Sequence, residues 1–139
     1  ALFVDDTFTV DVTDGFDILY RVNAGGPAVA AIDGDIDWEE DTTTNNSQYL
    51  SNPGSNDSFS GNVSSTDSSV DTGTTPFTIF ETERFDDTPG APNFTYSFPV
   101  PQAGNYEIRL YMGNGFSGTA NPNERFFDVT IECLSLPLL

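Results

Sequence analysis

The sequence predicts an all-β protein, a jelly-roll-like β-sandwich with little or no helix. Short runs in which apolar and polar residues alternate recur along the chain, most clearly at 94–98 and 106–110. Such alternation is typical of strands with one buried face. Gly, Pro, Asn and Asp residues separate these runs, as in proteins built from many short strands. No stretch carries its apolar residues at a helical spacing.

Chain length and charge limit the possible functions. At 139 residues the chain is long enough for one domain with a single core. It has 22 acidic residues and only four basic ones, which gives a net charge of -18. This charge excludes ordinary nucleic-acid binding, which needs cations against the phosphates, and it argues against attachment to anionic membranes. It fits either plain solubility, for example in a salty medium, or the binding of divalent cations.

The residue types that are missing exclude several kinds of catalysis. The sequence has no His, so it holds neither a Ser-His-Asp triad nor a His-ligated zinc. Cys133 is the single cysteine and cannot form an internal disulfide. No apolar run reaches the roughly 18 residues that a membrane span needs. Because the chain begins at Ala1, without a basic signal region, we expect a mature secreted or cell-surface protein; the alternative is a piece trimmed from a longer chain.

The predicted strands begin in a separate N-terminal segment, 1–16. Phe8, Val10 and Val12 alternate there with polar residues, and a Thr-Asp-Gly turn follows them. The sandwich itself is expected over 17–139. Its first strand contains Ile18, Tyr20 and Val22, a turn follows at Gly25-Gly26-Pro27, and the apolar run 28–32 then leads to an acidic segment with the only Trp.

The segment 42–76 is rich in Ser, Thr, Asn, Asp and Gly and is predicted to be a long loop. A few apolar residues, among them Tyr49 and Phe59, are spaced like anchors for this loop, and one short strand is expected around 59–63. Long ordered loops in compact domains are usually functional.

The remaining strands are predicted at 78–81, 93–100, 105–112 and 125–132, with Gly, Pro and Asn turns between them. Their alternation predicts which side chains face the core. Together with the first strand they give the expected core residues: Ile18, Tyr20, Val22, Phe80, Tyr96, Phe98, Tyr106, Ile108, Leu110, Phe127, Val129 and Ile131.

Several of these segments carry the residues of a known family. YRVNAGG at 20–26 resembles the opening strand of the malectin-like carbohydrate-binding modules. FETERF at 80–85, followed by FTYSFPVP at 94–101, resembles that family's T-E-R-aromatic segment and its next strand. GNYEIRL at 104–110 and RFFDVTIE at 125–132 resemble two further family strands in the same order. The resemblance implies a sandwich fold and the binding of neutral oligo- or polysaccharides without hydrolysis.

One feature departs from the family order. FTVDVTDG at 8–15 resembles a strand that the family carries near its C-terminal end, whereas here the chain stops shortly after the R-x-F-D-V strand. The resemblance therefore implies a displaced closing strand, which either fills its own sandwich or inserts into a neighbouring copy. Because head-to-tail donation does not close on itself, the alternative function is a subunit of an extracellular filament. The residues expected in the assembly strand are Phe3, Phe8, Val10 and Val12.

Aromatic and acidic side chains are the expected carbohydrate ligands. Flat aromatic rings cover the apolar faces of sugars, and carboxylates accept hydrogen bonds from the hydroxyls. Trp38 stands where the resembled family has a cleft aromatic after its glycine turn, and we expect it to be the main stacking residue; the alternative is that it packs the turn against the sheet. The predicted carbohydrate-binding residues are Trp38, Asp35, Asp37, Glu39, Tyr49, Phe85 and Phe94. For each Phe the alternative is a place in the core.

The remaining charged residues have other expected roles. Glu83 and Arg84 are expected to form a structural ion pair, with Arg21 and Arg125 in similar roles. Asp33, Asp35 and Asp37 alternate but do not make an EF-hand, since its sixth position holds Trp38 instead of Gly. They are weak candidates for calcium, as is the pair Asp86-Asp87. A glycosidase needs two carboxylates that flank the bond, and the sequence does not locate such a pair. The resemblance implies binding without hydrolysis, so we expect a protein that is not an enzyme.

Overall fold

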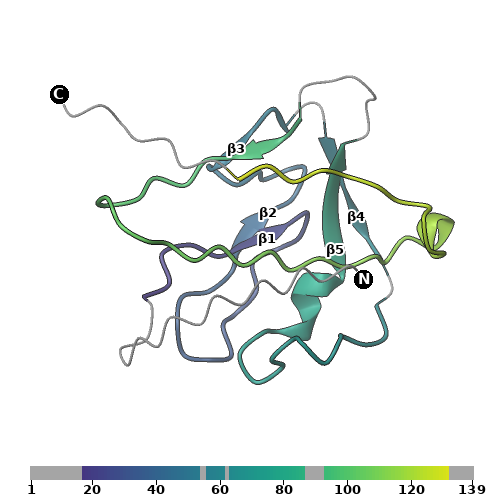
Figure 1. Ribbon diagram of the computed structural model, residues 1–139, viewed down its shortest axis with the longest axis horizontal. Helices are drawn as coiled ribbons and strands as arrows, with labels where there is room; N and C mark the ends of the chain where they lie inside the picture. Colours follow the sequence, from purple (N-terminus) through teal and green to yellow (C-terminus); the bar gives the residue numbers. More distant parts are fainter. Residues whose placement is uncertain (1–16, 54–55, 62, 87–92, 132–139) are drawn as a thin grey trace.

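The computed structural model describes residues 17–53, 56–61, 63–86 and 93–131 of the chain (Figure 1). The strand predicted at 8–12, with its assembly residues Phe3, Phe8, Val10 and Val12, lies outside the described residues, as do Asp87 and Cys133. The described elements are β1 (Val22–Ala24), β2 (Glu39–Asp41), β3 (Leu50–Ser51), β4 (Asn56–Ser60), the 3-10 helix η2 (Phe77–Phe80), β5 (Thr82–Asp86), β6 (Thr95–Tyr96) and the 3-10 helix η3 (Ser117–Thr119).

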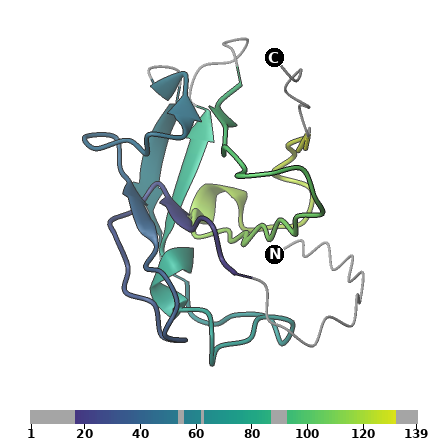
Figure 2. The same cartoon turned by 90° about the vertical axis from the view of Figure 1, so that its left-hand side faces the viewer.

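The described strands form three two-stranded pairs. β1 and β2 are parallel, with Val22 opposite Glu39, whereas β3 pairs with β6 and β4 with β5 in antiparallel fashion. The β4–β5 ribbon has the longest register, from Ser60 opposite Thr82 to Asn56 opposite Asp86. In Figure 2 the strand pairs lie to one side and the segment from 97 to 131 crosses beside them.

The all-β class is confirmed, because the helical residues in the described part of the chain form only short 3-10 turns. The jelly-roll arrangement of two packed sheets stays a prediction. Among the described residues no helix is long and apolar enough to cross a bilayer.

Several predicted strand boundaries were wrong. The strand expected at 78–81 is the 3-10 helix η2, which begins after Pro76 and ends where β5 starts. The apolar run 28–32 makes a single bridge, from Val29 to Trp38. The segments 105–112 and 125–131 belong to none of the described strands, because no described neighbour supplies the backbone groups that a ladder needs.

The buried core is smaller than predicted. It consists of Trp38, Ile79 and Phe80, with Val29, Val63, Val70 and Tyr111 packed against it. Phe80 was predicted correctly, and Ile18, Tyr20, Val22 and Tyr96 are half-buried. The other predicted core residues are 39 to 61 % exposed: Phe98, Tyr106, Ile108, Leu110, Phe127, Val129 and Ile131. Exposure does not alternate along 105–110 or 126–131, where every residue is exposed, so the predicted inside and outside faces are not observed there.

Candidate functional site

A glycine turn joins the first strand to the rest of the molecule. Gly25 has a φ of +85°, which favours glycine, and its N–H donates to the Asp41 carbonyl at 3.0 Å. A Cβ on Gly25 would lie 2.2 Å from the carbonyl oxygen of Glu83 in β5. The side chain of Asn23 is buried beside this turn, where it donates to the carbonyl of Pro27 at 2.8 Å and accepts from the Thr82 hydroxyl at 3.2 Å. The glycines thus allow β1 and β5 to approach closely.

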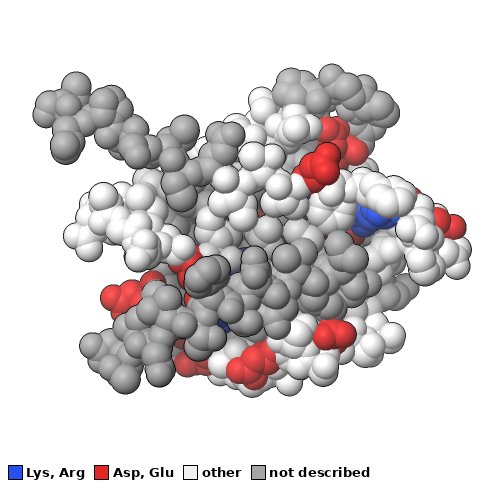
Figure 3. All heavy atoms as spheres, in the orientation of Figure 1, with Lys and Arg blue, Asp and Glu red and all other residues white. Residues whose placement is uncertain are grey.

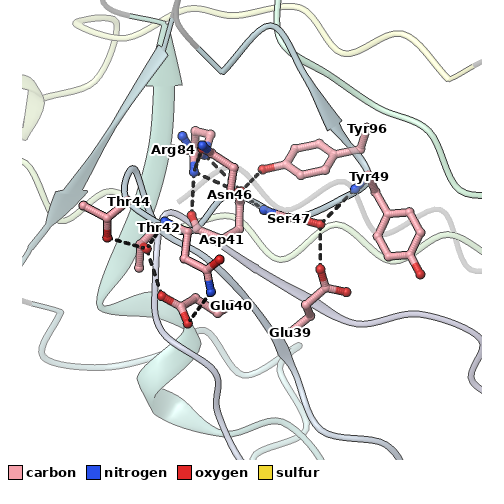
Figure 4. Close-up of polar contacts among 11 residues, drawn as sticks. Glu39, Glu40, Asp41, Thr42, Thr44, Asn46, Ser47, Tyr49, Arg84 and Tyr96 are labelled. Atoms are coloured by element: carbon pink, nitrogen blue, oxygen red, sulfur yellow. Dashed lines mark hydrogen bonds and ion pairs between the residues drawn. The ribbon is translucent and has the colours of Figure 1, made fainter.

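A buried ion pair connects the strand pairs. Arg84 on β5 donates to both carboxylate oxygens of Asp41 on β2, at 2.9 and 2.8 Å, and both side chains are almost fully buried (Figure 4). Tyr96 of β6 donates its hydroxyl to the same carboxylate, and the backbone N–H of Ser47 donates to it at 2.9 Å. Burial and the hydrogen bond to Asp41 raise the pKa of Tyr96. The Asp41 carboxylate is fully satisfied, so this cluster holds the fold together.

Two of the other arginines also make structural ion pairs. Arg21 pairs with Asp33 and donates to the carbonyl of Ile36 at 2.9 Å, which fixes the acidic loop. Arg125 donates to Glu83 at 2.8 Å. The structural role expected for Arg84 is confirmed, but its partner is Asp41 and not Glu83, because Glu83 lies on the opposite face of β5.

Trp38 lies in the core. Its exposed fraction is 7 %, its ring meets Tyr111 edge-on at 5.5 Å between centroids, and the Arg21 guanidinium lies 5.3 Å from its ring centroid. A ring covered on these sides has little surface to offer a sugar. The geometry therefore gives no support to Trp38 as the main stacking residue, and that role stays a prediction.

The predicted carboxylate ligands are distributed over one loop and β2. Asp35 and Asp37 are exposed, and Asp37 accepts from the Ala31 N–H at 2.8 Å. Glu39 accepts from the Ser47 hydroxyl at 3.0 Å, next to Tyr49. Acidic side chains are spread over the face drawn in Figure 3 and do not gather in one place. The described residues contain no group of three or more acidic, His or Cys side chains able to hold a metal, so calcium binding by Asp33, Asp35 and Asp37 stays a prediction.

Two of the predicted aromatics, Tyr49 and Phe94, belong to one row of rings. Tyr49 contacts Tyr20 and Phe98 at 4.9 and 5.0 Å between ring centroids. Phe98 lies parallel to Tyr96 at 6.1 Å, and Tyr96 meets Phe94 edge-on at 6.1 Å. These rings mostly cover one another beside the β3–β6 pair.

The predicted Phe85 lies on the other strand pair, and the structure brings two further rings near it. In the β4–β5 ribbon Phe59 is opposite Glu83, so Phe59, Glu83 and Phe85 share one face, with Phe59 and Phe85 as diagonal neighbours. Phe116 meets Phe59 edge-on at 5.4 Å between centroids and is itself 45 % exposed. We call Phe59, Phe85 and Phe116 the phenylalanine face.

An open hollow of about 280 Å³ lies beside this face. Phe59, Ser60 and Gly61 line it from the ribbon, and Asn114 and Phe116 line it from the glycine-rich loop. Gly61 and Gly115 pack against each other at one side of the hollow. The contact is so close that a Cβ on Gly61 would lie only 2.6 Å from the Gly115 Cα. The hollow therefore combines exposed aromatic surface with polar side chains, the combination that sugars require.

The sequence interpretation did not include Phe116 or Asn114 and gave Phe59 little weight. The Asn114 amide and the Thr119 side chain hold the loop by hydrogen bonds, with the Asn114 amide donating to the Thr119 carbonyl at 2.6 Å and accepting from its hydroxyl at 3.1 Å. In the sequence the only available signal was an aromatic residue within a loop that has three glycines between 113 and 118.

Comparison with protein families identifies the chain. The model of the malectin domain matches residues 18–135, which is most of the sequence. The chain belongs to the malectin domain family. The comparison with curated proteins found no match, and neither did the comparison with solved structures. Malectin domains bind carbohydrate and are generally not catalytic, so the family assignment points to a carbohydrate-binding module. The resemblance inferred from the strand motifs is confirmed.

Proposed function

We propose that this malectin domain is a secreted or cell-surface module that binds neutral glycans without hydrolysing them, through the phenylalanine face. The observation that carries the proposal is the edge-to-face pair of half-buried Phe59 and exposed Phe116, with Phe85 on the same face of β4–β5 and a hollow beside them. Stacking on these rings supplies affinity, and Asn114 lines the hollow with an amide N–H that its bond to the Thr119 carbonyl leaves for a sugar hydroxyl.

The charge of the chain supports neutral sugars over acidic ones. A net charge of -18 repels uronates and sulfated glycans. Near the phenylalanine face, Arg125 is already paired with Glu83 at 2.8 Å, so this cation is not free to bind an acidic sugar. Small open sites of this kind bind weakly, so arrays of sugars on a polymer raise the effective affinity.

A glycan array followed by calorimetry tests the proposal. Phe116→Ala is the informative variant, because an exposed side chain can be truncated at little cost to the fold. We expect it to weaken binding about tenfold or more, which corresponds to about 1.4 kcal/mol. The matched control is Phe126→Ala, since Phe126 is 80 % exposed and does not line the hollow. Unchanged binding by Phe116→Ala, or no binding to any neutral glycan, contradicts the proposal.

Self-association is the second candidate function, and the exposed apolar rows support it. Ile108 and Leu110 are 54 and 51 % exposed, and Val129 and Ile131 are 51 and 56 % exposed. Large exposed apolar surface of this kind commonly marks an interaction site. We propose that a strand from a second copy, the one containing Phe8, Val10 and Val12, is the partner of these rows.

Sedimentation velocity over a dilution series tests self-association. We expect large assemblies that dissociate on dilution, and Phe8→Asp should leave only a monomer. Thr9→Asp, which adds a charge at the neighbouring position of the same predicted strand but on its polar face, is the matched control. A wild-type protein that remains monomeric at every concentration contradicts this second candidate.

A further inference from the structure

A second hollow lies at the end of the β4–β5 ribbon, apart from the phenylalanine face. Its volume is about 700 Å³, within the range of about 300 to 1,000 Å³ that is typical of small-molecule sites. The last ribbon pair, Ser60 opposite Thr82, borders it, and so do Thr78 and Glu81 at the corner between η2 and β5. The segment 27–30 also lines it.

The base of this hollow is rigid. Asn23 is 1 % exposed, and its amide is held between the Pro27 carbonyl and the Thr82 hydroxyl. Gly26 packs against the same two side chains so closely that a Cβ there would lie 2.2 Å from the Thr82 Oγ1. A preformed base of this kind lowers the entropy that a ligand must lose on binding.

The walls combine apolar surface with unpaired polar groups. Ala28, Val29 and Ala30 contribute apolar surface. Ser60, Thr78 and Glu81 also line the hollow, and their side chains have no hydrogen-bond or ion-pair partner among the described residues. Two hydroxyls and one carboxylate in a hollow that also has apolar lining suit a ligand with hydroxyl groups on its rim and C–H surface on its face. The carboxylate disfavours an anion.

The two hollows meet at Ser60 and Gly61, which line both of them. Gly61 ends the ribbon, with its N–H donating to the Glu81 carbonyl at 2.9 Å, and it carries no side chain that would separate the hollows. Phe59 and Ser60 are neighbours in one strand and point to opposite faces, so the first hollow lies on the Phe59 face and the second on the Ser60 face. A chain of sugars can therefore continue from one hollow into the other around the end of the ribbon.

We propose that the hollow between Ala30 and Glu81 is a further glycan subsite, so that the protein binds an internal stretch of a neutral polysaccharide and not only a terminal sugar. The inference rests on the proposed function of the phenylalanine face. Ala28, Val29 and Ala30 contact the sugar face, and Ser60, Thr78 and Glu81 bond its hydroxyls.

Calorimetry with oligosaccharides of increasing length tests the subsite. The probes are neutral cello-, malto- and xylo-oligosaccharides, each from the disaccharide to the hexasaccharide. For the series that binds, we expect affinity to rise about tenfold or more with length. Ala30→Trp fills the second hollow from an exposed wall position and should abolish this rise, while affinity for the disaccharide changes by less than about twofold. Ala103→Trp, at an exposed alanine that lines neither hollow, is the matched control.

The outcomes separate this inference from the proposed function. If the disaccharide binds but affinity does not rise with length, or if Ala30→Trp retains the rise, the second subsite is wrong and the phenylalanine face stands. If no probe in any series binds and no neutral glycan on the array binds, both proposals are wrong. Glu81→Gln gives an independent readout: it should reduce the affinity of the hexasaccharide and leave that of the disaccharide unchanged.

Discussion

Arg84 and Asp41 are 43 residues apart in sequence and form the most buried ion pair of the described structure, with side-chain exposures of 1 % and 0 %. The pair joins β5 to β2, and Tyr96 adds β6 to the same carboxylate. Three strand pairs therefore meet at one acidic side chain. In a domain with so few buried apolar side chains, this polar cluster takes a large share in defining how the pairs are arranged.

Removing the arginine of this pair should be strongly destabilising. We expect Arg84→Met to lower the free energy of unfolding by about 3 to 5 kcal/mol, because it leaves the Asp41 carboxylate buried without its cation. Urea denaturation measures the change. Arg125→Met is the matched control: its pair with Glu83 is partly exposed, so its loss should cost less than about 1 kcal/mol. Equal effects of the two variants would show that burial of the Arg84 pair is not decisive.

The glycine turn gives a second prediction, with a control of the same backbone conformation. Gly25 and Gly34 have φ values of +85° and +84°, but a Cβ on Gly25 would meet the Glu83 carbonyl, whereas one on Gly34 would meet nothing within 4 Å. We expect Gly34→Ala to cost about 1 to 2 kcal/mol through backbone strain alone. Gly25→Ala should cost about 3 to 5 kcal/mol, since overpacking adds to the strain. Thermal unfolding that ranks the two variants equally would contradict the close contact between β1 and β5.

Local patterns in the sequence predicted the fold class, the glycine turn and the structural role of Arg84. The alternating runs and the absence of a helical period gave the all-β class, and Gly25-Gly26 marked a turn because a conformation with positive φ needs glycine. Arg84 was expected to be structural because an Arg–carboxylate pair inside a sandwich fixes strand geometry and tolerates burial when it is bidentate. These inferences depend on one residue and its immediate neighbours.

Partners distant in the sequence could not be predicted. Glu83 was the expected partner of Arg84, but adjacent strand residues point to opposite faces, and the true partner, Asp41, is supplied by β2. Phe116 was missed because an aromatic residue in a glycine-rich loop has no periodicity to place it. The exposure of Ile108 and Val129 could not be predicted either, since alternation identifies a face but not the element that covers it.

The pair of Arg21 and Asp33 predicts a dependence of stability on pH. Hydrogen bonds from the Arg21 guanidinium lower the pKa of Asp33 from 3.8 to about 2 in the folded protein. Since the folded state binds this proton less readily than the unfolded chain, the pair stabilises the fold fully above about pH 4 and loses this effect as the pH falls toward about 2.

The measurement is the difference in unfolding free energy between wild type and Asp33→Asn along a pH series. We expect the difference to be largest near neutral pH and to shrink steadily below about pH 4. Asp35→Asn is the control for the loss of one negative charge from the same loop, which matters in a chain with a net charge of -18. A difference that is constant down to about pH 2 would be inconsistent with the lowered pKa.

The last prediction separates a role in stability from a role in binding, for Trp38 and Phe116. Trp38 is 7 % exposed and lies among core residues, so Trp38→Phe should lower the unfolding free energy by about 1 to 2 kcal/mol, less than the roughly 3 to 5 kcal/mol of a change to Ala. Phe116 is 45 % exposed, so Phe116→Ala should change stability by less than about 1 kcal/mol. For glycan affinity we expect the opposite order: about tenfold loss in Phe116→Ala and no change in Trp38→Phe.

Both measurements are made on the same samples, with folding checked by near-ultraviolet circular dichroism before calorimetry. If a well-folded Trp38→Phe variant loses affinity as strongly as Phe116→Ala does, then Trp38 contacts the sugar, as its position after the glycine turn predicted. In that case the ring must become accessible when ligand binds, and the phenylalanine face is at most a part of the site. If only Phe116→Ala loses affinity, Trp38 acts as the packing residue beneath Arg21 that the structure describes.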